Sequence, residues 1–212
     1  MDYYDIIGDI HGYASKLKLL LDRLGYVEKN GCYQHESRIA IFVRDYIDRG
    51  PEQAEVIAIV KAMVDSGSAL AIMGNHEFNA ICYAIPDSAN PGQYLRKHND
   101  SNYDQHKAFL NEFPLNSQQH TDAIEWFKTL PVYLDLEHIR VVHACWHQPA
   151  IVQLKEILNE DNTIPDDVFV TASRPEHAHF RLIEDVVKSP EVKLPDGFSF
   201  LDSGKKNALL FG

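Results

Sequence analysis

Cysteines are few in this sequence, and it has no long apolar run and no leader-like segment. Cys32, Cys82 and Cys145 form no CxxC pair, so the sequence suggests neither a thiolate zinc site nor a disulfide framework. No apolar run approaches the roughly 20 residues that a membrane-spanning helix requires. Residues 1–9 (MDYYDIIGD) also lack the basic and then apolar regions of a secretory signal. We therefore expect a cytoplasmic protein without a membrane partner.

Basic residues are the minority charge. Lysine and arginine number 20 against 31 aspartates and glutamates, so the formal net charge is -11. This balance repels polyanions unless basic residues gather on one face, and the sequence contains no Lys/Arg block, so we expect no nucleic-acid partner. An excess of carboxylates does suit a site for divalent cations, since each ion cancels two charges. No linker-like stretch divides the chain, so we expect one domain over residues 1–212.

Apolar periodicity predicts alternating strands and helices, which argues for an α/β layered fold. The first predicted strands span residues 3–7, 39–43 and 69–73, and the first predicted helices span residues 17–24 and 56–64. Later, we predict strands at 132–136 and 139–142, helices at 123–130, 150–158 and 176–188, and two short strands around Asp202-Ser203-Gly204.

A polar segment at about 86–120 reads as an insertion of the kind that often covers a site. We predict one short helix in it, near residues 105–111. Its histidines His98, His106 and His120 are expected to be exposed to solvent.

Four chemically rich loops each follow a predicted strand, where an α/β sheet places its ligand-binding loops. In residues 8–12 (GDIHG), Asp9 and His11 stand two apart in extended chain and so point the same way. The other loops are residues 43–50 (VRDYIDRG), 74–77 (GNHE) and 143–145 (HAC). Each loop alone has a structural explanation, such as a polar turn, a helix start or a surface ion-pair cluster. Their joint occurrence in this order is the strong signal.

Together these loops resemble the motifs of the calcineurin-like metallophosphoesterase superfamily, which read GDxHG, GDxxDRG, GNHE and a histidine followed by small residues. The resemblance covers residues 9–143 and is nearest to the phosphoprotein-phosphatase branch. The chain also resembles bacterial symmetrical dinucleoside tetraphosphate hydrolases. The resemblance implies a two-layer β-sandwich core flanked by helices (α/β/β/α), with two divalent metal ions above the strand ends.

The same resemblance implies the metal ligands. Asp9, His11 and Asp45 would bind one ion, while Asp45, Asn75 and His143 would bind the other, with Asp45 as the bridge. Mixed carboxylate, imidazole and amide ligands suit Mn first, or Fe or Zn, rather than the all-oxygen shells of Mg or Ca. A hydroxide between the two ions would then attack phosphorus in line, without a covalent phosphoenzyme.

Three further side chains are expected to carry the reaction. His76 would protonate the leaving oxygen as general acid, and Asp48 would fix its tautomer. Arg49 supplies a planar fork for two phosphate oxygens. Asn75 and Arg174 are candidate substrate contacts. Other candidates for a phosphate clamp or a metal ligand are His147, His177 and His179.

Two features depart from the family motifs. Where the family has glycine before the bridging aspartate, this chain has Arg44, which we expect to point away from the metals and to lower activity or stability. The family also has a further histidine after a late strand, whereas this sequence stops at Gly212. The second ion should therefore be held weakly, and the sequence leaves open whether the C-terminus is truncated.

The leading hypothesis is a dinuclear metal-dependent phosphatase that hydrolyses phosphomonoesters. Its first substrate candidate is a phosphoprotein and its second is a small molecule, a dinucleoside polyphosphate. A catalytically impaired family member that serves as a binding or regulatory module is the rival from another class, favoured by Arg44 and the missing histidine. A nucleic-acid phosphodiesterase comes third, because the acidic balance counts against it. The oligomeric state is left open.

Overall fold

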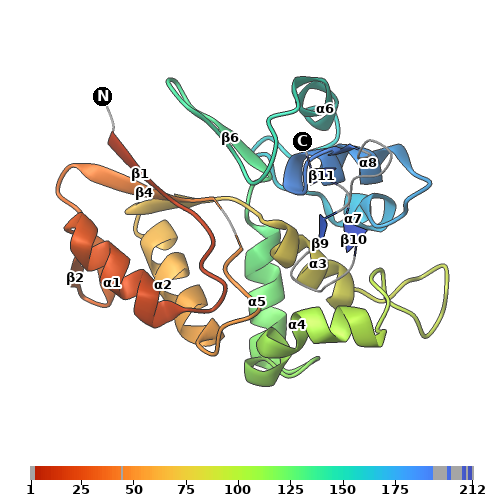
Figure 1. The fold of residues 1–212 in the computed structure, drawn as a ribbon, viewed down its shortest axis with the longest axis horizontal. Helices are drawn as coiled ribbons and strands as arrows, with labels where there is room; N and C mark the ends of the chain where they lie inside the picture. The colour runs from red at the N-terminus through yellow and green to blue at the C-terminus, as the bar shows by residue number, and fades with distance from the viewer. Residues whose placement is uncertain (1–2, 44, 193–199, 202–206, 209, 212) are drawn as a thin grey trace.

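The computed structural model describes residues 3–43, 45–192, 200–201, 207–208 and 210–211 of the chain. Arg44 and the turn at Asp202-Ser203-Gly204, both singled out in the sequence, lie outside the described residues. The fold is a mixed α/β fold (Figure 1). Its central sheet has three parallel strands in the order β1–β4–β5, which are Tyr3–Ile7, Arg38–Phe42 and Ala69–Ala71.

Each central strand leads into a loop and then a helix, as the sequence predicts for the first two. The following helices are α1 (Ala14–Leu24), α2 (Gln53–Asp65) and α3 (Asn75–Ala84). In the register of the sheet, Ile7 lies opposite Phe42, and Phe42 lies opposite Ala71. The three loops therefore leave the sheet at the same edge.

The two faces of the central sheet pack against different layers. Since successive side chains on a strand point to opposite faces, Phe42 belongs to the large core shared with α1 and α2, while Ile41 and Val43 pack with Val141. Val141 lies on β7 (Arg140–Val142), which forms an antiparallel hairpin with β6 (Tyr133–Asp135). The result is a layer of helices, a parallel sheet and a β-hairpin, in agreement with the predicted fold class.

The remaining elements surround this core. Figure 1 shows α6, α7 and α8 grouped at the side away from β1 and α1, with α4 below them. The further helices are α4 (Asp100–Glu112), α5 (Gln118–Lys128), α6 (Gln148–Leu154), α7 (Asp166–Ala172) and α8 (Ala178–Val187). The further strands are β2 (Val27–Lys29), β3 (Cys32–Gln34), β8 (Glu191–Val192), β9 (Phe200–Leu201), β10 (Asn207–Ala208) and β11 (Leu210–Phe211).

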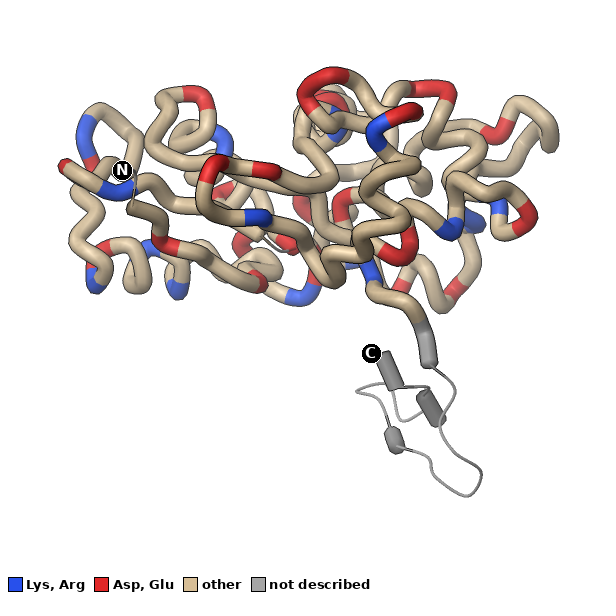
Figure 2. Tube along the Cα trace, turned by 90° about the horizontal axis from the view of Figure 1, so that it is seen from above, with Lys and Arg blue, Asp and Glu red and all other residues tan. Residues whose placement is uncertain are grey.

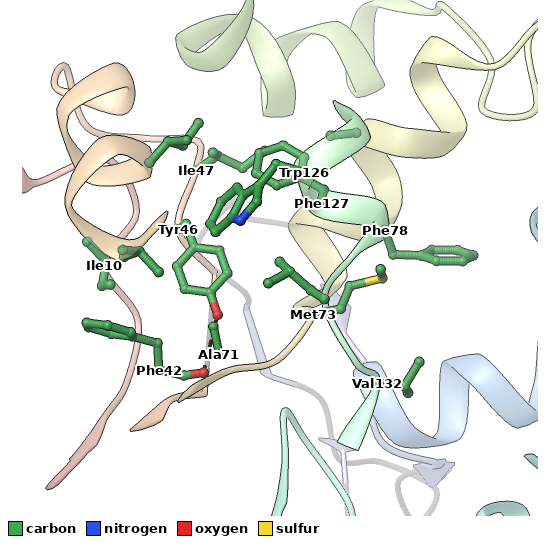
Figure 3. Packing of buried hydrophobic residues seen from close by; sticks show 14 of the residues in the cluster. Ile10, Phe42, Tyr46, Ile47, Ala71, Met73, Phe78, Trp126, Phe127 and Val132 are labelled. Atoms are coloured by element: carbon green, nitrogen blue, oxygen red, sulfur yellow. Dashed lines mark hydrogen bonds between the residues drawn. The ribbon is translucent and has the colours of Figure 1, made fainter. Parts of the chain in front are cut away.

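Tyr46, a residue of the loop after β4, directs its side chain into the centre of the core. Figure 3 shows its ring between Phe42 and Trp126, and all its surface is buried. Its hydroxyl lies 2.7 Å from the Ile72 carbonyl oxygen, which gives this buried donor an acceptor. The ring centroids of Tyr46 and Trp126 are 5.9 Å apart. Tyr46 thus ties the loop after β4 to α5 and to the end of β5.

The polar insertion is more ordered and more buried than the sequence suggests. The helix predicted at 105–111 begins earlier, because the Asn99 side chain accepts a hydrogen bond from the Asn102 N–H and caps α4. His106 and His120 are 4% and 2% exposed, so the prediction that they face solvent is wrong, whereas His98 is exposed. Both buried rings lie beside Phe109, on the apolar side of α4 and α5.

The short helix α7 was not predicted, and the two strands predicted near the end are present as the antiparallel pair β9–β10. No helix among the described residues is both long and apolar enough to cross a membrane. In the view of Figure 2, Lys and Arg positions are scattered among Asp and Glu positions rather than gathered in one place. The expectation of one domain over residues 1–212 stays a prediction.

The loops after β1 and β4 are joined by their backbones. The N–H groups of Ile10 and His11 donate to the Asp45 carbonyl at 3.0 and 2.9 Å, and Gly12 N–H donates to the Tyr46 carbonyl at 2.7 Å. In return, Gly50 N–H donates to the His11 carbonyl at 2.8 Å. The two loops therefore behave as one rigid unit.

Replacement of Gly50 should separate these loops. A Cβ atom at Gly50 would lie 2.4 Å from the Gly12 carbonyl oxygen and 2.5 Å from that of His11, and both are backbone atoms that cannot turn away. We expect Gly50→Ala to lower the free energy of unfolding by about 3 kcal/mol. Gly8→Ala is the matched control, since a Cβ there meets nothing within 4 Å. Urea titration of both variants measures the difference, and equal midpoints would contradict the close approach.

Candidate active site

Asp9, His11 and Asp45 are brought together by the joined loops. His11 has a positive φ of 46°, which turns its side chain back toward the start of the second loop. Its Nε2 atom lies 3.8 Å from Asp9 Oδ2 and 3.8 Å from Asp45 Oδ2. These separations are too long for hydrogen bonds but fit donors that share one cation at about 2.0–2.2 Å each.

The tautomer of His11 supports this interpretation. Its Nδ1 lies 3.0 Å from the Ile47 carbonyl oxygen, and since a carbonyl only accepts, Nδ1 carries the proton. Burial, the largest influence, lowers the pKa of His11 and so favours the neutral ring. The lone pair of Nε2 then faces two carboxylates, and among the described residues this buried atom has no hydrogen-bond partner. A metal ion fits this arrangement, because a neutral imidazole held through its other nitrogen is a typical ligand.

Asn75 and His143 repeat the pattern on the other side of Asp45. His143 Nδ1 lies 3.1 Å from the Val43 carbonyl oxygen, which leaves its Nε2 2.9 Å from Asn75 Oδ1. The same Nε2 is 3.8 Å from Asp45 Oδ1. One oxygen of Asp45 thus faces His11 and the other faces His143. This is the geometry that a bridging carboxylate needs.

His76 lies between the two proposed ion positions and Asp48. Its Nδ1 is 2.5 Å from Asp48 Oδ2, and its Nε2 is 3.7 Å from Asp45 Oδ2. Burial lowers the pKa of His76, but the hydrogen bond to Asp48 and the charge of Asp45 outweigh it, so the net pKa is raised. His11, Asp45 and His76 also form a compact group whose ligand atoms all lie within 4.8 Å of one another. His76 can therefore hold a proton or face a metal.

Arg49 and the first loop line an open cavity of about 480 Å³. Its wall includes Asp9 and His11 from the first loop, and Tyr13 and Lys16 from the N-cap and first turn of α1. Lys16 Nζ lies 3.9 Å from the centroid of the Tyr13 ring. Lys16 and Tyr13 were not singled out in the sequence, because neither belongs to a motif and only the first turn of α1 brings them beside Asp9.

Glu77 also supports the site, although the sequence suggested only that it stabilises the start of a helix. It is fully buried, and its two oxygens accept from the N–H groups of Tyr46 at 2.9 Å and Gly74 at 3.1 Å. Burial and the nearby charge of Asp45 raise its pKa to about 8. Glu77 thereby ties the GNHE loop to the loop that carries Asp45.

Asp48 also contacts a histidine of the polar insertion. His106 Nδ1 lies 3.1 Å from Asp48 Oδ1. The Asp48 backbone has a positive φ of 68°, and its N–H donates to Gln53 Oε1 at 2.8 Å. The sequence gives no signal for the His106 contact, since the two residues stand 58 positions apart.

The remaining candidates have partners elsewhere. The Arg174 guanidinium lies 2.7 Å from Asp87 Oδ1, within the segment between α3 and α4. His147 Nδ1 lies 3.1 Å from Asp185 Oδ2. His179 Nδ1 lies 2.8 Å from Thr171 Oγ1, and its ring centroid is 4.4 Å from that of His177.

The model of the calcineurin-like phosphoesterase family matches residues 4–196. The asymmetrical bis(5'-nucleosyl)-tetraphosphatase PrpE of Oceanobacillus iheyensis is 36% identical over 141 residues, which cover 66% of this chain and 54% of that protein. The protein of the same name from Halalkalibacterium halodurans is 47% identical over 74 residues, which cover 34% of this chain and 30% of that protein. The chain thus spans about half the length, or less, of these curated relatives.

Among solved structures, a cold-active protein tyrosine phosphatase matches with a TM-score of 0.50 and 15% identity. The match covers 86% of this chain and 52% of that one. At this identity the likeness concerns the fold alone, and it agrees with the layered α/β architecture.

Metal binding should depend most on Asp45, because its two oxygens face both proposed ion positions. We expect Asp45→Asn to weaken Mn²⁺ binding at two sites by roughly tenfold or more, and Asp9→Asn to weaken one. Asp65→Asn is the control, since Asp65 is exposed and pairs with Lys61 at the end of α2. Calorimetric titration of the metal-free proteins measures the effect. Unchanged Mn²⁺ binding in Asp45→Asn would show that the proposed metal site is wrong.

Proposed function

The chain belongs to the calcineurin-like phosphoesterase family, and on that premise we propose that it is a metal-dependent hydrolase of dinucleoside tetraphosphates. This substrate stood second to phosphoprotein in the sequence hypothesis, and the names of the curated relatives favour it. Those relatives are named asymmetrical, whereas the sequence resemblance pointed to symmetrical enzymes. We therefore propose cleavage into a nucleoside triphosphate and a nucleoside monophosphate.

The observation that carries the proposal is the cavity beside Asp9 and His11. It offers two cations, Arg49 and Lys16, where a single phosphoryl group needs one planar fork. A tetraphosphate chain carries several negative charges and must approach a protein of net charge -11, so local cations beside the metal site are needed. Lys16 Nζ lies over one face of the Tyr13 ring on the same wall, and an attached nucleobase would stack on the other face.

The proposed ligands are Asp9, His11, Asp45, Asn75 and His143. Two divalent ions held there, Mn first among the candidates, would activate a water molecule and neutralise the phosphoryl oxygens. Arg49 would bind the phosphoryl oxygens, and His76 would donate its Nε2 proton to the leaving oxygen while Asp48 accepts from Nδ1. Phosphomonoesters would be processed by the same groups. Asn75 is a further proposed substrate contact, whereas Arg174, which pairs with Asp87, stays a prediction from the sequence.

The assay that tests the proposal supplies diadenosine tetraphosphate or a phosphoserine peptide to the purified chain with Mn²⁺. We expect AMP and ATP from the former, at a higher kcat/KM than phosphate release from the peptide. Lys16→Ala should raise the KM for the tetraphosphate by roughly three- to tenfold, because it removes one of the two protein cations that would face the phosphate chain. The KM for p-nitrophenyl phosphate should not change.

Lys18→Ala is the matched control, because Lys18 lies on the same helix and pairs with Glu55 instead. Two equivalents of ADP would show symmetrical cleavage. A preference for the phosphopeptide would restore the phosphoprotein hypothesis. A chain that binds no Mn²⁺ and cleaves neither substrate would favour the regulatory module.

The effect of His76 on turnover should increase with the basicity of the leaving group. We expect His76→Ala to lower turnover of an alkyl phosphate by roughly 10²–10⁴, the usual range for a lost general acid. The loss should be smaller for p-nitrophenyl phosphate and for the tetraphosphate, whose leaving oxygens need no proton at neutral pH. Steady-state rates on the three substrates give the comparison. Equal losses on all three would show that His76 is not the proton donor.

A further inference from the structure

Two histidines share the carboxylate of Asp48, one from each side. His76 Nδ1 lies 2.5 Å from Oδ2, and His106 Nδ1 lies 3.1 Å from Oδ1. The side chains of His106 and Asp48 are 6% and 4% exposed, so water does not compete for this contact. Each oxygen of the carboxylate therefore faces one imidazole ring.

The direction of these hydrogen bonds follows from the charge of Asp48. An ionised carboxylate only accepts, so both rings direct an Nδ1–H at it. Burial, the largest influence, raises the pKa of Asp48, but the hydrogen bonds from His106 and His76 outweigh it and keep the net pKa below the ordinary value. His76 is thereby left with its Nε2 on the side of Asp45.

Helix α4 holds His106 firmly against this loop. The His106 ring stacks on Phe109 at a centroid distance of 5.0 Å. One turn further along α4, the Glu112 carboxylate accepts from the N–H groups of Gln53 at 2.7 Å and Ala54 at 2.9 Å, and so caps α2. Gln53 in turn accepts from the backbone N–H of Asp48. The polar insertion thus contacts Asp48 in two ways. His106 binds the Asp48 side chain directly, and Glu112 supports Gln53, which accepts from the Asp48 backbone N–H.

We propose that His106 is a positioning residue for His76. By bonding Oδ1, it fixes the plane of the Asp48 carboxylate, so that Oδ2 holds the His76 ring with Nε2 aimed at the leaving oxygen. His106 acts through Asp48 and has no contact with the reacting atoms. The inference rests on the proposed role of His76, and it gives the polar insertion a function in the reaction rather than only as a cover.

Two variants separate the hydrogen bond from packing. His106→Phe keeps the aromatic stack on Phe109 but removes the donor, while His106→Asn places an amide N–H where the ring Nδ1–H stood. We expect His106→Phe to lower turnover of an alkyl phosphate by roughly tenfold, with a smaller loss for p-nitrophenyl phosphate. His106→Asn should recover most of the difference. Lys107→Ala, at an exposed position of α4 that pairs with Asp104 on the same helix, is the control and should match the parent chain.

A double-mutant cycle shows whether His106 works through His76. In the His76→Ala background, His106→Phe should cause no further change in the leaving-group dependence. If His76→Ala itself shows no such dependence, the proposed proton donor fails. If His76→Ala shows it and His106→Phe does not alter it, or His106→Asn behaves like His106→Phe, the inference fails.

A second measurement needs no turnover and can be made on the metal-free chain. In a ¹H–¹⁵N correlation spectrum of histidine-labelled protein, His106 should carry its proton on Nδ1, with a downfield signal that is lost in Asp48→Asn. Thermal unfolding of that variant confirms that the fold persists. A His106 ring protonated only on Nε2 would overturn the inference whatever the kinetics show.

Discussion

The backbone hydrogen bonds between the loop after β1 and the loop after β4 are the constraint on which the rest of the site depends. The Asp45 carbonyl accepts from both Ile10 and His11, so the residue that supplies the shared carboxylate also fixes the backbone of the first loop. Gly50 closes the contact from the other end, where its N–H reaches the His11 carbonyl. These main-chain bonds fix the backbone of His11 and Asp45 relative to each other, so the two side chains start from positions that already converge.

Burial of negative charge is the cost of this arrangement. Asp45, Asp48 and Glu77 are 5%, 3% and 0% exposed, and carboxylates packed this closely repel one another. The chain offsets the repulsion differently at each position. Two imidazole donors face Asp48, whereas Glu77 accepts backbone N–H groups and has its pKa raised to about 8, so it is mostly protonated at neutral pH. Asp45 Oδ1 accepts from the His76 backbone N–H at 3.2 Å, but Asp45 Oδ2 faces the Nε2 atoms of His11 and His76 at 3.8 and 3.7 Å, too far for hydrogen bonds. A bound cation would therefore stabilise the folded chain as well as the reaction.

The parts of this structure that follow local rules could be predicted from sequence. The central strands and the loops after them follow from apolar runs that lead into Gly8–Asp9, Arg44–Asp45 and Gly74–Asn75, and the parallel order brings those loops to one edge. His106 could not be placed in this way, because its partner Asp48 is 58 residues away and the polar composition of the insertion suggests solvent. Lys16 was missed for a related reason, since only the first turn of α1 carries it to Asp9.

The two proposed substrate classes place different demands on this machinery. A phosphomonoester with an alkoxide leaving group needs a proton, which the proposed Asp48–His76 pair, with His106 on the other oxygen of Asp48, would hold. A tetraphosphate releases a nucleotide as a stable anion and needs cations along its chain, which Arg49 and Lys16 on the cavity wall would provide. A protonated His76 would still serve the second case, because its Nε2 lies 3.7 Å from Asp45 Oδ2 and its positive charge would face the negative charge that gathers beside the proposed ions. The same imidazole can thus act as an acid toward one substrate and as a fixed charge toward the other.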